Sequence, residues 1–206
     1  FAGIDVFDIE LNEKNVDKLV DVVAALEPTF GGINLEDIKA PECFEVEERC
    51  RARMNIPVFH DDQHGTAIIA AAGVLNAALL TGRDMKDMKV VVNGAGAASI
   101  SCTELIKALG VPHDNVIMCD SKGVIYQGRT EGLNQWKSAH AVRTDARSLA
   151  EAVKGADVFL TSPESLLSQA ITTAIRQTPP VRGTSQEDGY YELLGVPINE
   201  EWRVYA

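Results

Sequence analysis

A turn of small residues between an apolar strand and a helix constrains the fold of this chain more than any other feature. Residues 93–99 read Asn-Gly-Ala-Gly-Ala-Ala-Ser. The apolar run 89–93 before the turn is typical of a buried strand, and residues 97–109 after it predict a helix that Gly110 ends. A strand, a glycine-rich turn and a helix in this order are typical of a dinucleotide-binding fold.

Each glycine of the turn has a specific role in that interpretation. Gly94 allows the tight turn, Gly96 lets the backbone approach a pyrophosphate, and the start of the helix offers free N–H donors to the anion. Ser99 occupies the third small position, which indicates a slightly wider spacing of helix and strand. Asp120 ends the next strand, where a ribose-binding acid is expected. A purely structural turn is the alternative. The predicted cofactor-binding residues are Gly94, Ala95, Gly96, Ala97, Ala98 and Asp120.

Strands and helices alternate around this turn. Residues 116–119 and 158–160 read as two further strands, and residues 145–154 as a helix between them. This order predicts an α/β fold with a mainly parallel, doubly wound, Rossmann-like sheet and right-handed crossovers. Residues 65–80 are apolar on every face, which predicts a helix buried between layers at the joint of two substructures.

The N-terminal third predicts a smaller set of elements. Helices are expected over residues 13–26, with Asn12 as the cap, and over residues 42–54. Short strands are expected over residues 30–35 and 56–59. Beyond residue 161 the sequence pattern changes. It predicts a helix beginning at Ser162, followed by a linker over residues 178–189.

Two pairs of carboxylates follow the two short strands. Glu36 and Asp37 come after the first strand, and Asp61 and Asp62 come after the second. Open α/β sheets bind ligands beyond the carboxyl ends of their strands, so the four acids could face one site. They would repel one another unless a cation lay between them, and oxygen ligands suit Mg²⁺ or Mn²⁺. Helix caps and solvated loop residues are the alternative interpretation.

His60 and His64 bracket the second acidic pair at a spacing that could suggest two metal ligands on a helix. The intervening residues do not match the His-Glu-x-x-His pattern of zinc enzymes. We expect structural roles for both histidines, such as hydrogen bonds to the acids.

Composition excludes several classes of function. Thirty acidic residues against 19 basic ones give a net charge of −11, which argues against nucleic acid and anionic membranes as partners. The four cysteines form no close-spaced pair, so we expect reduced, ordinary thiols. No apolar run approaches the roughly 18 residues that span a bilayer. A leader is not visible, which makes the cytoplasm the expected location, although Phe1 indicates a fragment or a processed product.

Two runs of sequence carry a family resemblance. Residues 31–44 read Gly-Gly-Ile-Asn-Leu-Glu-Asp-Ile-Lys-Ala-Pro-Glu-Cys-Phe, and residues 56–67 read Ile-Pro-Val-Phe-His-Asp-Asp-Gln-His-Gly-Thr-Ala. Together they resemble the metal-binding signature of bacterial malic enzymes of the NADP-dependent type, and the resemblance extends over residues 1–160. It implies the end of the malic enzyme N-terminal domain at residues 1–63, the first half of an NAD(P)-binding domain at 64–160, and a divergent tail at 161–206.

The resemblance also implies an activity and a set of site residues. In that family, the positions of Glu36, Asp37 and Asp62 hold Mg²⁺ or Mn²⁺, and the position of Asp61 supports a catalytic lysine by hydrogen bonding and charge. The implied reaction oxidises malate, releases CO₂ and leaves pyruvate, with NADP or NAD as the hydride acceptor. Asp120 favours NAD, whereas Lys122 favours the 2′-phosphate of NADP, and we expect NADP. Full-length relatives are expected to be homo-oligomers.

The chain departs from the family pattern in two places. The family's general-acid tyrosine and general-base lysine belong to a segment upstream of residue 1, and residues 161–206 have no counterpart that we can place. We therefore expect the isolated chain to turn over malate poorly. The alternatives are a truncated, non-catalytic fragment that binds the cofactor, and a metal-independent NAD(P) dehydrogenase.

Overall fold

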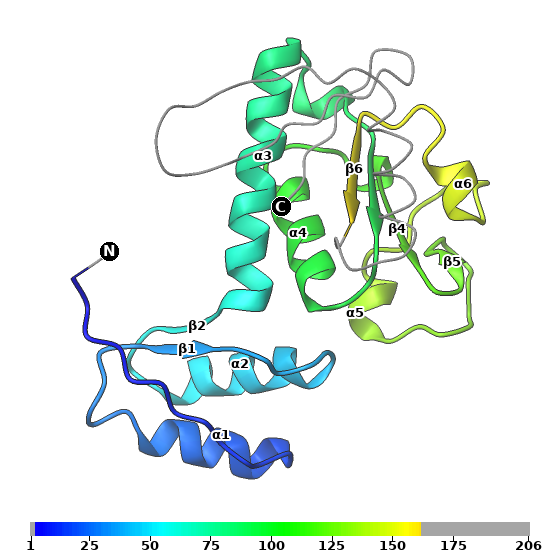
Figure 1. Ribbon diagram of the computed structural model, residues 1–206. Coiled ribbons are helices and arrows are strands. Elements are labelled where there is room, and N and C mark those ends of the chain that lie inside the picture. Colours follow the sequence, from blue (N-terminus) through cyan, green and yellow to red (C-terminus); the bar gives the residue numbers. More distant parts are fainter. Residues whose placement is uncertain (1–2, 162–206) are drawn as a thin grey trace. The chain divides into compact units, whose positions relative to one another are not determined.

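The computed structural model describes residues 3–161, and it divides the chain into two compact units. The first unit is Phe1–Asp61 and the second is Asp62–Ala206 (Figure 1). The helix predicted to begin at Ser162, the linker at 178–189 and nearly all of the tail at 161–206 lie outside the described residues.

The first unit consists of two helices and two short strands. Its elements are α1 (Val16–Ala25), β1 (Ile33–Leu35), α2 (Glu42–Arg53) and β2 (Val58–His60). The predicted elements are therefore present, but α1 begins later than expected. Asn15, and not Asn12, is the N-cap, because the Asn15 side chain accepts a hydrogen bond from the Lys18 N–H at 3.1 Å. The apolar faces of these elements share one core, formed by Val20, Val23, Leu35, Val46, Cys50, Met54 and Val58.

The second unit is built around a four-stranded sheet with the order β5-β4-β3-β6. Three strands are parallel, as predicted: β3 (Val90–Asn93), β4 (Val116–Asp120) and β6 (Val158–Thr161). The edge strand β5 (Gly123–Val124) is antiparallel and was not predicted, because two residues carry no strand pattern. Gly123 is required there because a Cβ atom would lie 2.3 Å from the carbonyl oxygen of Arg147, and because its φ is +98°.

Helices and single turns complete the second unit. The helices are α3 (Thr66–Thr81), α4 (Ala97–Ala108), α5 (Gln135–Ser138) and α6 (Leu149–Ala152). A π-helical turn, η1 (Asp61–Gly65), precedes α3, and 3₁₀ turns lie at η2 (Met85–Asp87) and η3 (His113–Asn115). The helix predicted over residues 145–154 is only one turn long. Ser148 and Glu151 form a capping box, and α6 begins at Leu149, four residues later than the expected Asp145.

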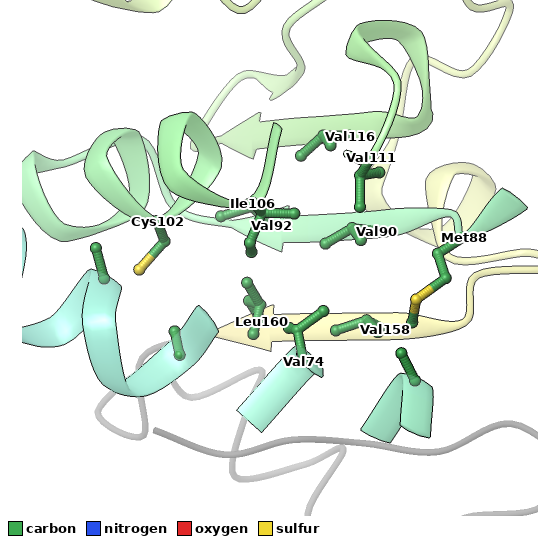
Figure 2. Close-up of a cluster of buried hydrophobic side chains, with 13 residues drawn as sticks. Val74, Met88, Val90, Val92, Cys102, Ile106, Val111, Val116, Val158 and Leu160 are labelled. Carbon is green, nitrogen blue, oxygen red and sulfur yellow. The ribbon is translucent and has the colours of Figure 1, made fainter. Parts of the chain in front are cut away.

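Both faces of the sheet are buried. Figure 2 shows Val90, Val92, Val158 and Leu160 of the sheet packed against Val74 of α3 and Ile106 of α4. The alternate residues of the strands point to the opposite face, where Val91, Ile117 and Phe159 join the short helix α6. Because each strand is covered on two sides, its sequence is continuously apolar and does not alternate.

Helix α3 differs from its prediction in one respect. Ala70, Val74 and Ala78 are buried, but Leu79 and Leu80 are 79% and 68% exposed. The prediction that this helix is buried on every face is therefore wrong. Within the described part of the chain, other residues cover only one side of α3. By length and composition alone, the helical stretch Asp61–Thr81 is long and apolar enough to cross a membrane, and its length includes the turn η1. A core helix with one buried face meets the same test.

Candidate functional site

The glycine turn joins β3 to α4, as the sequence predicts. The Gly94 N–H donates to the Cys119 carbonyl at 2.8 Å, and its φ of +133° is a region that side chains avoid. A Cβ atom at this position would lie 2.8 Å from Ser99 Oγ. Gly94 is therefore required by the fold itself, and Ser99 fills the space next to it.

Gly96 has a different environment. A Cβ atom there would meet nothing within 4 Å, and the residue is exposed with a negative φ of −88°. Gly96 is the N-cap of α4 and supplies no side chain to the first turn, so the first N–H groups of the helix have no side-chain cap. The turn offers open space beside free N–H donors, which is what a pyrophosphate needs. The flanking Ala95, Ala97 and Ala98 are partly buried, and their side chains are single methyl groups.

The turn lies at a topological switch point of the sheet. From β3 the chain passes to β4 on one side and then to β6 on the other side. Ligands of open α/β sheets bind beyond the carboxyl ends of the strands at such a point. Asn93 and Thr161 end the two adjacent strands there, and Asn93 Nδ2 donates to Thr161 Oγ1 at 3.1 Å. This pair was not predicted from the sequence, although polar side chains at the ends of two apolar strands could have indicated it.

Asp120 ends β4, as predicted, but its carboxylate is already bound. Arg129 donates to its two oxygens at 2.8 and 2.9 Å, Lys137 Nζ lies at 3.0 Å, and the Lys122 N–H donates at 2.9 Å. The Asp120 side chain is only 7% exposed. Burial acts to raise the pKa of this carboxyl, but the hydrogen bonds from Lys122, Lys137 and Arg129 outweigh it and hold the pKa below its ordinary value.

Arg129 is fully engaged in holding the segment after β4. Its two donations to Asp120 are joined by donations to the carbonyls of Gly123, Val124 and Glu131, which use all five N–H groups of the guanidinium. Although Arg129 follows Asp120 closely in the sequence, it cannot bind a cofactor phosphate, since the side chain is buried and has no donor left. Lys122 remains on the surface, where its ammonium pairs with Glu131 at 2.7 Å.

The first unit brings one acid from each predicted pair to the same end of a sheet. β1 and β2 are parallel and pair Leu35 with His60, so Glu36 and Asp61 each follow the last paired residue of a strand. Asn34 Nδ2 donates to Glu36 Oε1 at 2.8 Å and orients this carboxylate. Asp37 has a φ of +56°, an uncommon conformation for a residue with a side chain.

Asp62 is the next residue in the chain after Asp61 and opens the second unit. Carboxylate oxygens are the donors that Mg²⁺ and Mn²⁺ prefer, so the chemistry of the predicted ligands fits these cations. Among residues 3–161, however, no three histidine, cysteine, aspartate or glutamate side chains already lie in an arrangement that could hold a metal ion. The four cysteines are buried free thiols, as expected.

Two family models match this chain. The malic enzyme N-terminal domain matches residues 2–51, and the malic enzyme NAD binding domain matches residues 63–159. Between them they account for most of the chain, and the second includes the whole glycine turn with β3, α4 and β4.

Curated relatives carry the same family name. The chain is 67% identical to an NADP-dependent malic enzyme of Rhizobium meliloti (strain 1021) over 77% of its length, and 58% identical to an NAD-dependent malic enzyme of the same strain over 78%. It spans 21% of the length of each of these relatives.

A solved structure gives the same result for the fold. The NAD-dependent malic enzyme of Thermotoga maritima superimposes with a TM-score of 0.73 and 44% identity, over 78% of this chain and 44% of that one. With both domain models matched along its length, this chain belongs to the malic enzyme family.

Proposed function

We propose that this chain is the part of a malic enzyme that holds the divalent cation and contains the first half of the dinucleotide-binding domain. The whole enzyme would oxidise malate and decarboxylate the product to pyruvate and CO₂ while it reduces NAD(P). One observation carries the proposal: an acid follows each of two paired parallel strands in a chain that matches both malic enzyme domains. We place the N-terminal domain segment at 1–63 and the dinucleotide-binding segment at 64–160.

The residues have separate roles in this proposal. Glu36, Asp37 and Asp62 would hold Mg²⁺ or Mn²⁺, and Asp61 would support a neighbouring catalytic base by its charge. The cation, when bound, supplies Lewis-acid polarisation of the substrate oxygens, and the nicotinamide accepts the hydride. The open space at Gly96 and the free N–H groups of α4 would receive the pyrophosphate. We further propose a cytoplasmic homo-oligomer for the whole enzyme.

A titration with Mn²⁺ tests the metal ligands. We expect Asp62→Ala to lower the affinity of the chain for Mn²⁺ by at least about tenfold, because a ligating carboxylate is lost. Asp87→Ala is the matched control, since Asp87 lies in η2, is not one of the proposed ligands, and its substitution removes the same charge. Equal affinities of the two variants would refute the assignment.

NADP is the proposed cofactor, because the carboxylate that would select NAD is occupied. Asp120 is bound by Arg129 and Lys137 and could accept a ribose hydroxyl only by giving up one of these contacts. Lys122 is exposed nearby and can exchange Glu131 for a phosphate. In an enzyme that contains this segment, Lys122→Ala should raise the KM for NADP much more than the KM for NAD. An equal effect on both cofactors would remove the basis for this preference.

Turnover is tested by segment exchange. Residues 3–161 would replace the matching segment of the Rhizobium meliloti NADP-dependent malic enzyme, and malate-dependent reduction of NADP would be measured with Mn²⁺. We expect activity in the chimera and none in its Asp62→Ala form. An inactive chimera that is folded and binds NADP would contradict the proposed activity.

A cofactor-binding polypeptide without catalysis is the second candidate. It is favoured by the contrast between the complete β3–α4–β4 turn and the described carboxylates, which form no ready metal group. The purified chain discriminates the two. Calorimetric binding of NADP without malate turnover by the chain itself supports this candidate, whereas turnover excludes it.

A further inference from the structure

Three basic side chains meet at the far end of α4, away from the glycine turn. Lys107 lies in the last turn of the helix, and its Nζ is 3.1 Å from Nδ1 of His113 and 3.2 Å from Nδ1 of His140. His113 belongs to η3, and His140 follows α5. The cluster therefore joins the end of α4 to the turn η3, six residues further on, and to the segment after α5, 33 residues further on. It uses no residue of the proposed dinucleotide or metal site.

The hydrogen bonds define which nitrogens carry protons. An ammonium has only donors, so both Nδ1 atoms must accept from Lys107, and both imidazoles must be neutral with the proton on Nε2. His113 agrees with this assignment, because its Nε2 is 3.1 Å from the carbonyl oxygen of Ala141, which can only accept. A proton added to either Nδ1 would place two donors face to face and break the contact with Lys107.

His140 is the member that water reaches least. It is 4% exposed, and its Nε2 is a buried nitrogen with no hydrogen-bond partner in the described part of the chain. Burial, and then the positive charge of Lys107, lowers the pKa of His140 to about 4. Burial lowers the pKa of Lys107 to about 8, so Lys107 is still an ammonium near neutral pH.

We propose that Lys107, His113 and His140 form a proton-sensitive latch, which fastens the second half of α4 to η3 and to residues 139–141 near neutral pH and opens when His140 takes up a proton. The latch residues take no part in the proposed reaction, and they act only by fixing the positions of other elements. It holds the helix whose other end receives the pyrophosphate, and the segment next to Lys137, which contacts Asp120.

The acidic groups that face the latch do not reverse this effect. Glu104 of α4 lies 3.8 Å from His140 Nε2, but its side chain is 65% exposed and its charge is screened by water. Asp114 of η3 accepts from the backbone N–H of Arg143 at 3.2 Å and acts on Lys107, whose pKa it tends to raise. The nearest charge to His140 is the Lys107 ammonium, which opposes protonation.

The strength of the pH dependence follows from linkage. In the open state His140 is in water with its ordinary pKa of 6.5, and in the closed state its pKa is about 4. The open state therefore binds more protons between these values, and the closed state is favoured above pH 6.5 and loses that advantage as the pH falls towards 4. Between pH 7.5 and pH 5.5 the population of the open state should rise about tenfold.

Hydrogen exchange on the full chain tests the latch. Protection factors, corrected for intrinsic exchange rates, would be measured at pH 7.5 and pH 5.5 for residues 104–109 and 137–143. We expect protection to fall about tenfold in the parent chain and less than about twofold in His140→Asn. The Asn Oδ1 can accept from Lys107 as Nδ1 does, but it does not titrate. Helix α1 in the other unit is the internal control and should show no such fall.

A second measurement does not depend on a variant that folds. Nitrogen chemical shifts of the histidine rings in the parent chain report the tautomer and the titration of His140 directly. We expect the Nε2–H tautomer at pH 7.5 and a midpoint well below 6.5. An Nδ1–H tautomer or an ordinary midpoint would overturn the latch, and so would a tenfold loss of protection that persists in His140→Asn.

Discussion

At the scale of single residues, both glycines of the turn fit the dinucleotide-binding motif, but they are required for different physical reasons. Gly94 is held at a positive φ with Ser99 against it, whereas Gly96 has an ordinary φ and open space beside it. The fold therefore needs Gly94, and only the proposed ligand needs Gly96. Substitutions at the two positions should separate stability from binding.

We expect Gly96→Val to abolish dinucleotide binding and to leave the melting temperature nearly unchanged, because the added methyl groups fill the space of the pyrophosphate. Gly94→Ala should instead destabilise the chain by roughly 1–3 kcal/mol, through the backbone strain of its φ. Calorimetry with NADP and thermal melts measure both effects. Undiminished binding by Gly96→Val would mean that the turn is only structural.

The Asp120–Arg129 pair is a second feature at this scale, and its loss should measurably lower the free energy of unfolding. Both side chains are nearly inaccessible to water, so Arg129→Leu should leave a buried, poorly compensated carboxylate and lower the free energy of unfolding by about 3–5 kcal/mol. Lys122→Ala breaks the exposed pair with Glu131 and is the control, with an expected loss of at most about 1 kcal/mol. Similar losses in urea melts would contradict the buried role of Arg129.

The pH dependence of the same pair has a definite sign. The folded-state pKa of Asp120 is lowered from 3.8, so its contribution to stability is present above that value. It is lost as the pH falls through the lowered pKa. Urea melts between pH 5 and pH 2 should therefore show a steeper acid loss in the parent than in Asp120→Asn, and parallel curves would contradict this assignment.

At the scale of elements, the sequence predicted the long, strongly patterned ones and missed the short ones. The apolar runs at β3, β4 and β6 indicated a parallel sheet because both of its faces are buried. β5 and α5 have two and four residues, too few for any periodicity, and they depend on contacts with Arg129 and Lys137. The engagement of Asp120 could not be predicted, since its partners lie nine and 17 residues away.

Helices α3 and α4 offer a matched test of what holds the elements together. Ile106 is completely buried between α4 and the sheet, so Ile106→Ala should lower the free energy of unfolding by about 2–5 kcal/mol. Leu79 on the outer face of α3 is 79% exposed, and Leu79→Ala should change it by less than about 0.5 kcal/mol. A large loss in Leu79→Ala would show that other residues cover this face.

At the scale of the whole molecule, the two units have separate cores. One core is formed by the residues around Val46 and Cys50, and the others lie on the two faces of the second unit's sheet. The cysteines are divided between them, with Cys43 and Cys50 in the first unit and Cys102 and Cys119 in the second. Each pair of thiols can therefore report the opening of its own unit.

Burial raises the pKa of Cys43 and Cys102 to about 11 and that of Cys119 to about 12, and it also raises the pKa of Cys50. At pH 8 the folded thiols should therefore react with an alkylating reagent much more slowly than the same thiols in urea, because they must first be exposed by opening. Ile106→Ala weakens only the second core. We expect it to accelerate the labelling of Cys102 and Cys119 by at least about tenfold, since 1.4 kcal/mol corresponds to a factor of ten, and to leave Cys43 and Cys50 unchanged. Mass spectrometry of labelled peptides measures the four rates together, and equal acceleration at all four sites would show that the two units open as one.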